Sequence, residues 1–148
     1  MRVTLAFRKG TKKHWISKLI MFFDKSEYDH VEIIIGTAWI GAHIKTGVVV
    51  HHLKKPLKDT WDYIDIEVDR KYNHQAVMFV DGLHNAKYDF YGAIFGELMG
   101  ITIINQYDDY FCSELVTKIL QRFESEPVKD LHAVNVSPQE LYNLYKDK

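Results

Sequence analysis

Cysteine is nearly absent from this sequence: one occurs among 148 residues, at position 112. A single cysteine cannot form an intrachain disulfide, and it cannot build a metal site from several thiolates. Two uses remain for Cys112, a buried apolar residue or a thiolate nucleophile. A lone free thiol also agrees with a reducing compartment.

The sequence also lacks long apolar runs and an excess of charge of one sign. No stretch approaches the ~20 apolar residues of a membrane-spanning helix, and the first residues contain no apolar run typical of a signal peptide. We therefore expect no membrane span and a cytoplasmic location. The net charge of −1 argues against a nucleic-acid partner.

Linkers, repeats and low-complexity segments are missing as well, and only three prolines occur. Hydrophobic residues make up 47% of the chain and aromatic residues 14%, which indicates a globular protein. A chain of this length suits one domain with a sizeable core. We expect a single domain over residues 1–148.

Apolar periodicity predicts strands mainly in the first half of the chain and helices mainly in the second. The expected strands cover residues 3–7, 30–35, 39–44, 48–52 and 61–68. The expected helices cover residues 11–23, 73–83, 88–99 and 112–123, and a capping box at Ser137 with Pro138 opens a last helix through Tyr145. Strands followed by helices indicate an α+β fold with an antiparallel sheet packed against helices.

Cys112 is the first candidate for chemistry because a helix is expected to begin there. Backbone N–H groups at a helix N-terminus stabilise an anion, which lowers the pKa of a thiol. Asp108 and Asp109, just upstream, would raise that pKa if their carboxylates pointed at the sulfur, but not if they cap the helix and face solvent. A packing role for Cys112 stays open.

A cysteine nucleophile needs a base, and His30 is the histidine best placed to serve. It begins an apolar strand in which period two puts His30 and Glu32 on one face. A polar pair at the start of an otherwise buried strand needs partners. The imidazole would take the thiol proton, and the thiolate would then attack an acyl carbon. The alternative is a histidine that is hydrogen-bonded to backbone.

A third polar group usually orients such a base, and His43 is expected to do so. A hairpin through Gly36 would place His43 beside His30 on the neighbouring strand. Glu32 is the alternative, but residues i and i+2 stand ~6.5–7 Å apart along a strand. Cross-strand neighbours stand ~4.5–5.5 Å apart, so we expect His43 rather than Glu32.

No metal site and no cofactor are expected. His51 and His52 are adjacent on a strand, so their side chains point to opposite faces. The sequence contains no HExxH motif, no carboxylate–histidine cluster with zinc spacing and no Gly-rich phosphate loop.

Five short segments occur in a recognisable order: His30-Val31-Glu32-Ile33-Ile34-Ile35-Gly36, Gly41-Ala42-His43-Ile44-Lys45-Thr46-Gly47-Val48, Tyr88-Asp89-Phe90-Tyr91-Gly92, Tyr110-Phe111-Cys112-Ser113-Glu114-Leu115-Val116 and Ser137-Pro138-Gln139-Glu140-Leu141. With the histidine strand before the cysteine helix, the chain resembles the circularly permuted papain-like hydrolases of the NlpC type. The histidine spacing is similar to that of their lecithin retinol acyltransferase-like branch. The resemblance implies a permuted papain-like fold with Cys112 as nucleophile at a helix N-terminus, His30 as general base and His43 as orienting residue.

The resemblance also implies a hydrolase that cleaves an amide, peptide or ester bond through an acyl-enzyme. The expected substrates are peptides, peptidoglycan fragments or lipid esters, and we expect their site to be lined by Glu32, Tyr28, Tyr88 and Tyr110. Phe111 stands where the acyltransferase branch has Asn, which favours hydrolysis. Many small relatives come from bacteria and phages, and a phage protein would act in the host cytoplasm. The alternatives are a binding or adaptor module on the same fold and a lipid acyltransferase.

Overall fold

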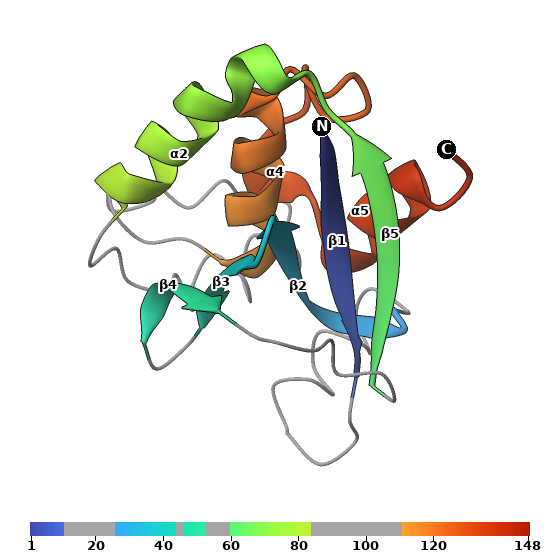
Figure 1. Ribbon diagram of the computed structural model, residues 1–148. Helices are drawn as coiled ribbons and strands as arrows, with labels where there is room; N and C mark the ends of the chain where they lie inside the picture. The colour runs from blue at the N-terminus through green and yellow to red at the C-terminus, as the bar shows by residue number, and fades with distance from the viewer. Residues whose placement is uncertain (11–25, 44–45, 53–59, 84–110) are drawn as a thin grey trace.

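The computed structural model describes residues 1–10, 26–43, 46–52, 60–83 and 111–148, which form one sheet with helices packed against it (Figure 1). The sheet has five strands in the order β4-β3-β2-β1-β5, and all neighbours are antiparallel. The strands are β1 (Arg2–Lys9), β2 (Tyr28–Ile35), β3 (Ala38–His43), β4 (Gly47–His52) and β5 (Trp61–Glu67). Each lies where the sequence predicted a strand, and the α+β class is confirmed.

Three α-helices follow the sheet in the described part of the chain. They are α2 (Asn73–Gly82), α4 (Cys112–Arg122) and α5 (Pro138–Tyr145), with short 3-10 turns η1 (Arg70–Tyr72) and η3 (Ala133–Asn135). These α-helices agree with the predictions for residues 73–83, 112–123 and the last segment. The helices expected at 11–23 and 88–99 lie outside the described residues.

The turn between β2 and β3 fixes which residues of these two strands face each other. Gly36 has a φ of +63°, a conformation that glycine adopts without steric cost and that other residues rarely adopt. Ile35 pairs with Ala38 directly across this turn, and Ile33 pairs with Ile40. The start of β2 and the end of β3 therefore lie at the same end of the sheet.

Alternate strand residues face two different environments, as the period of two requires. One face of the sheet belongs to the main core, which also takes up α4 and α5. From β1 and β2, this face contributes Val3, Leu5, Phe7, Val31 and Ile33. The other face carries a smaller cluster of Ala6, Trp39 and Trp61.

Helix α4 packs against β2 and β3, and α5 packs against β2 (Figure 1). The apolar residues of α4 recur at helical spacing and are all fully buried: Leu115, Val116, Ile119 and Leu120. No helix among the described residues has the length and apolar character needed to cross a membrane. The fold thus packs α4, which begins at Cys112, against β2 with its polar pair and against β3.

The N-terminus of α5 offers a test of the local code. Ser137 Oγ accepts a hydrogen bond from the Glu140 N–H at 3.2 Å, and Glu140 Oε2 accepts one from the Ser137 N–H at 2.9 Å. This is the predicted capping box. We expect Ser137→Ala to lower the free energy of unfolding by about 1 kcal/mol, because it leaves helix N–H groups without an acceptor. Glu140→Gln keeps an acceptor and should cost less. Urea unfolding of both variants checks this, and equal losses would contradict it.

Candidate functional site

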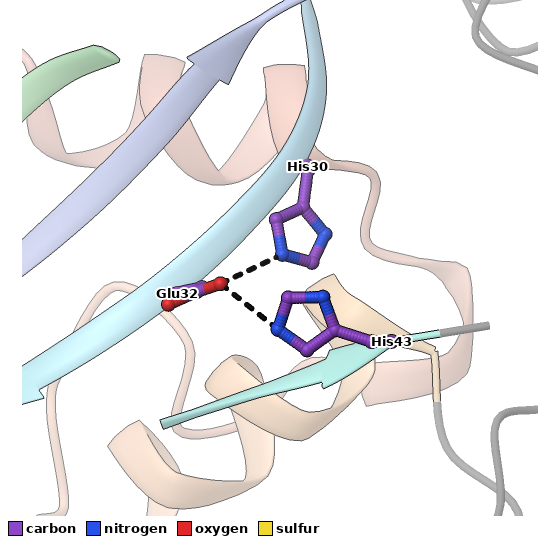
Figure 2. A group of neighbouring side chains, drawn as sticks. All are labelled: His30, Glu32 and His43. Atoms are coloured by element: carbon purple, nitrogen blue, oxygen red, sulfur yellow. Dashed lines mark hydrogen bonds and ion pairs between the residues drawn. The ribbon is translucent and has the colours of Figure 1, made fainter. Parts of the chain in front are cut away.

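Three polar side chains meet at one end of the sheet, where β2 begins and β3 ends (Figure 2). His30 and Glu32 come from β2, and His43 is the last residue of β3. His30 Nε2 lies 3.1 Å from Glu32 Oε1, at hydrogen-bond geometry. His43 Nε2 lies 3.1 Å from the same oxygen. One carboxylate oxygen therefore stands between two imidazole rings, whose centroids are 4.9 Å apart.

Gly41 makes room for this arrangement. If the Ile33–Ile40 register is continued by one residue, Glu32 faces Gly41, and His30 faces His43 after two more residues. A Cβ at Gly41 would lie 2.7 Å from Glu32 Cγ, closer than two such carbons approach. The missing side chain lets the Glu32 carboxylate lie across β3 toward His43.

The cluster is largely closed to solvent. His30 and Glu32 are 5% and 4% exposed, while the His43 side chain is 32% exposed. The edge of the Trp61 ring system packs against the His30 ring, with centroids 6.0 Å apart. Of the three side chains, His43 is the one that solvent reaches.

Burial and hydrogen bonding set the charges in the cluster. Burial alone would raise the pKa of Glu32, but its hydrogen bond with His30 and its close contact with His43 outweigh that effect and lower the pKa to about 2. Burial lowers the pKa of His30, against the opposing effect of Glu32. Near neutral pH the pair is thus a carboxylate and a neutral imidazole. Its hydrogen bond assigns the proton to Nε2 of His30, which leaves the lone pair on Nδ1.

His43 is held less completely than His30. Its Nε2 is buried and has no hydrogen-bond partner of good geometry, although Glu32 Oε1 is 3.1 Å away. The two atoms are therefore in close contact without an aligned hydrogen bond. The His51 ring packs edge-on against the His43 ring, with centroids 5.6 Å apart.

Cys112 is the first residue of α4 and is 4% exposed. A residue at a helix N-terminus has the unpaired N–H groups of the first helical turn close to its side chain. The side chain belongs to the main core, together with Val31, Ile33 and Ala42. The three cluster residues occupy the intervening strand positions, on the face of Trp61. Contact between the Cys112 sulfur and the His30 ring stays a prediction, and it requires that they meet at the end of the sheet.

Glu32 reaches His30, although the spacing of residues i and i+2 favoured His43 as the orienting residue. That spacing, more than about 6 Å, is the one along the strand backbone. Side chains on the same face lean along the strand, and the Glu32 carboxylate reaches His30 Nε2 at 3.1 Å. Glu32 therefore touches both histidines. The sequence signals for this were the His-x-Glu spacing and Gly41 opposite it.

Of the expected substrate-binding tyrosines, only Tyr28 is among the described residues. Tyr28 is 1% exposed and packs its ring against Phe7 and Tyr142, while its hydroxyl donates to Asp62 at 2.6 Å. These are contacts of a core residue, so a substrate-binding role for Tyr28 has no support. Tyr88 and Tyr110 lie outside the described residues.

Comparison with known proteins adds no family assignment. A scan against models of protein families found no match, and a search of curated proteins found no significant relative. The chemistry of the site must therefore be argued from its own residues.

The Gly41 contact predicts that even the smallest side chain there disturbs the cluster. We expect Gly41→Ala to lower the free energy of unfolding by about 1–3 kcal/mol, because the new Cβ must displace the buried Glu32 side chain. Gly82→Ala is the matched control, since no atom lies within 4 Å of a Cβ built there. Urea unfolding measures both. A neutral Gly41→Ala would show that Glu32 moves aside at no cost.

The lowered pKa of Glu32 predicts that part of the stability of the folded protein is lost in acid. The Glu32 carboxylate has a pKa of about 2 when folded and an ordinary value of 4.5. Its contribution to stability is thus complete above pH 4.5 and is lost as the pH falls toward 2. At 1.36 kcal/mol per pKa unit, that contribution is at most about 3 kcal/mol.

The test compares urea unfolding of the wild type and Glu32→Gln from pH 7 to pH 3. We expect the wild type to be the more stable at pH 7. The difference between the two free energies of unfolding should narrow below pH 4.5. His30 adds acid sensitivity of the same sign, because its lowered pKa makes the folded state bind the proton less readily than the unfolded state. A difference that stays constant down to pH 3 would contradict the assignment to Glu32.

Proposed function

We propose that the chain is a cysteine hydrolase with a permuted papain-like fold, in which Cys112 is the nucleophile and His30 the general base. The observation that carries the proposal is the buried hydrogen bond from His30 Nε2 to Glu32, because it leaves Nδ1 as the proton acceptor. A second support is the packing of α4, which begins at Cys112, against the two strands of the cluster.

The reaction follows from these roles. Nδ1 of His30 takes the thiol proton, and the Cys112 sulfur bonds to the carbonyl carbon of an amide or ester. The Cys112 backbone N–H stabilises the oxyanion, and His30 returns the proton to the leaving nitrogen or oxygen. Water then attacks the thioester and gives a proton to His30, which passes it to the leaving sulfur, so that the acid is released and the Cys112 thiol is restored.

Glu32 is the orienting group in this proposal, with His43 as its second partner. The ionised carboxylate holds the His30 ring in one tautomer and stabilises the imidazolium that forms during the reaction. Peptides, peptidoglycan fragments or lipid esters are the proposed substrates. We propose that the protein acts in the cytoplasm without a nucleic-acid partner.

One observation favours a second function, a binding or adaptor module on the same fold. Cys112 is almost fully buried and shares the apolar core with Val31 and Ile33. A free cysteine in such surroundings commonly serves packing. In that case the histidine–glutamate cluster would stabilise the sheet, and the thiol would be inert.

The two functions predict opposite reactivity of the one thiol. At pH 6.5 we expect native protein to react with iodoacetamide about tenfold faster than a cysteine peptide, because a helix N-terminus and an imidazole base both raise the thiolate fraction. His30→Gln should remove most of this gain. His74→Gln, which alters an exposed histidine on α2, is the matched control.

Labelling is followed by mass spectrometry, and circular dichroism shows that each variant is folded. A native thiol that reacts no faster than the peptide, with His30→Gln unchanged, would reject the hydrolase and support the binding module. Loss of the rate gain in His74→Gln as well would also contradict the assigned role of His30.

A further inference from the structure

We infer that His30, Glu32 and His43 form a binding site for a divalent transition-metal ion of the Zn²⁺ type. Each residue offers one ligand atom, and all three atoms lie within 4.8 Å of one another. Two histidines and one carboxylate are a common ligand set for zinc in proteins, with a further position left for water or substrate.

The distances in the cluster already approach those of a metal centre. Zinc bonds to imidazole nitrogen and carboxylate oxygen are ~2.0–2.1 Å long, so ligand atoms at tetrahedral corners stand roughly 3.3 Å apart. Glu32 Oε1 lies 3.1 Å from Nε2 of His30 and 3.1 Å from Nε2 of His43. An ion among the three atoms would leave these two separations almost unchanged and draw the two nitrogens toward each other.

A second observation concerns His43. Its Nε2 is buried, faces the cluster and lies 3.1 Å from Glu32 Oε1 without an aligned hydrogen bond (Figure 2). Buried polar atoms are rarely left in this state. A cation bound to its lone pair would satisfy it. The His43 side chain is one-third exposed, which gives the ion a route from solvent.

Metal binding would prevent His30 from acting as the base of the proposed hydrolase. Only this effect rests on the proposed function. A neutral imidazole carries one proton. When a metal takes the Nε2 lone pair of His30, the proton must reside on Nδ1. The ring then has no lone pair for the Cys112 proton, so the ion would suppress thiol activation without touching the sulfur.

The site is tested by titrating Zn²⁺ into the Cys112→Ser protein by calorimetry, and Co²⁺ by visible absorption. We expect one ion per chain, a rise in melting temperature, and the absorption of a tetrahedral Co²⁺ complex. His43→Ala and Glu32→Gln should each weaken binding by at least about tenfold. His52→Ala, an exposed histidine at the end of β4, is the matched control and should bind as before.

The site is rejected if Cys112→Ser shows no saturable binding, or if His52→Ala abolishes binding while His43→Ala does not. Iodoacetamide labelling of the wild type separates the two proposals. If Zn²⁺ binds but the thiol reacts no faster than the peptide, the metal site is supported and the hydrolase is rejected. If the thiol is activated, no Zn²⁺ binds and Zn²⁺ does not slow the labelling, the hydrolase is supported and the metal site is rejected.

Discussion

The contact on which this site depends is a buried carboxylate shared by two imidazole rings. Glu32 is 4% exposed, and an isolated charge at that depth would be strongly unfavourable. The carboxylate stays ionised because His30 donates to it and His43 lies against the same oxygen. The charge in turn fixes the His30 tautomer, so that one hydrogen bond both stabilises the fold and determines which ring nitrogen can accept a proton. The glycine at position 41 is the steric condition for this contact.

Because side chains alternate along each strand, the histidine–glutamate cluster and the main apolar core lie on opposite faces of the sheet. On β2, Val31 and Ile33 pack with α4, while His30 and Glu32 occupy the positions between them. Cys112 stands at the start of the helix that fills the apolar face. The proposed hydrolase therefore requires the Cys112 thiol and the His30 base to approach from two sides of one sheet, at the end where β2 begins. This requirement makes thiol reactivity, more than burial, the property that decides between an enzyme and a binding module.

Most of the secondary structure in the described residues follows from local sequence. Period two located all five strands, and Ser137 with Glu140 located the start of α5, because both patterns act over a few residues. The strand order was not predictable, since the pairing of β1 with β5 joins segments about sixty residues apart. Glu32 was expected only as the alternative to His43, because the spacing along the strand argued against a contact with His30. His-x-Glu and Gly41 are both visible in the sequence, but only the strand register shows that they face each other.

In the two proposals, the general base and the metal ligand are alternative roles of the same His30 ring. A proton on Nε2 of His30, held by Glu32, leaves Nδ1 basic; a cation at Nε2 sends the proton to Nδ1 and removes that basicity. Both states keep the Glu32 charge compensated, which the burial of the carboxylate demands. The two states would differ at His43, whose Nε2 lies 3.1 Å from Glu32 Oε1 without an aligned hydrogen bond and would bond directly to the proposed ion. In these proposals, the buried charge of Glu32 is balanced either by the hydrogen bond from His30 or by a bound cation.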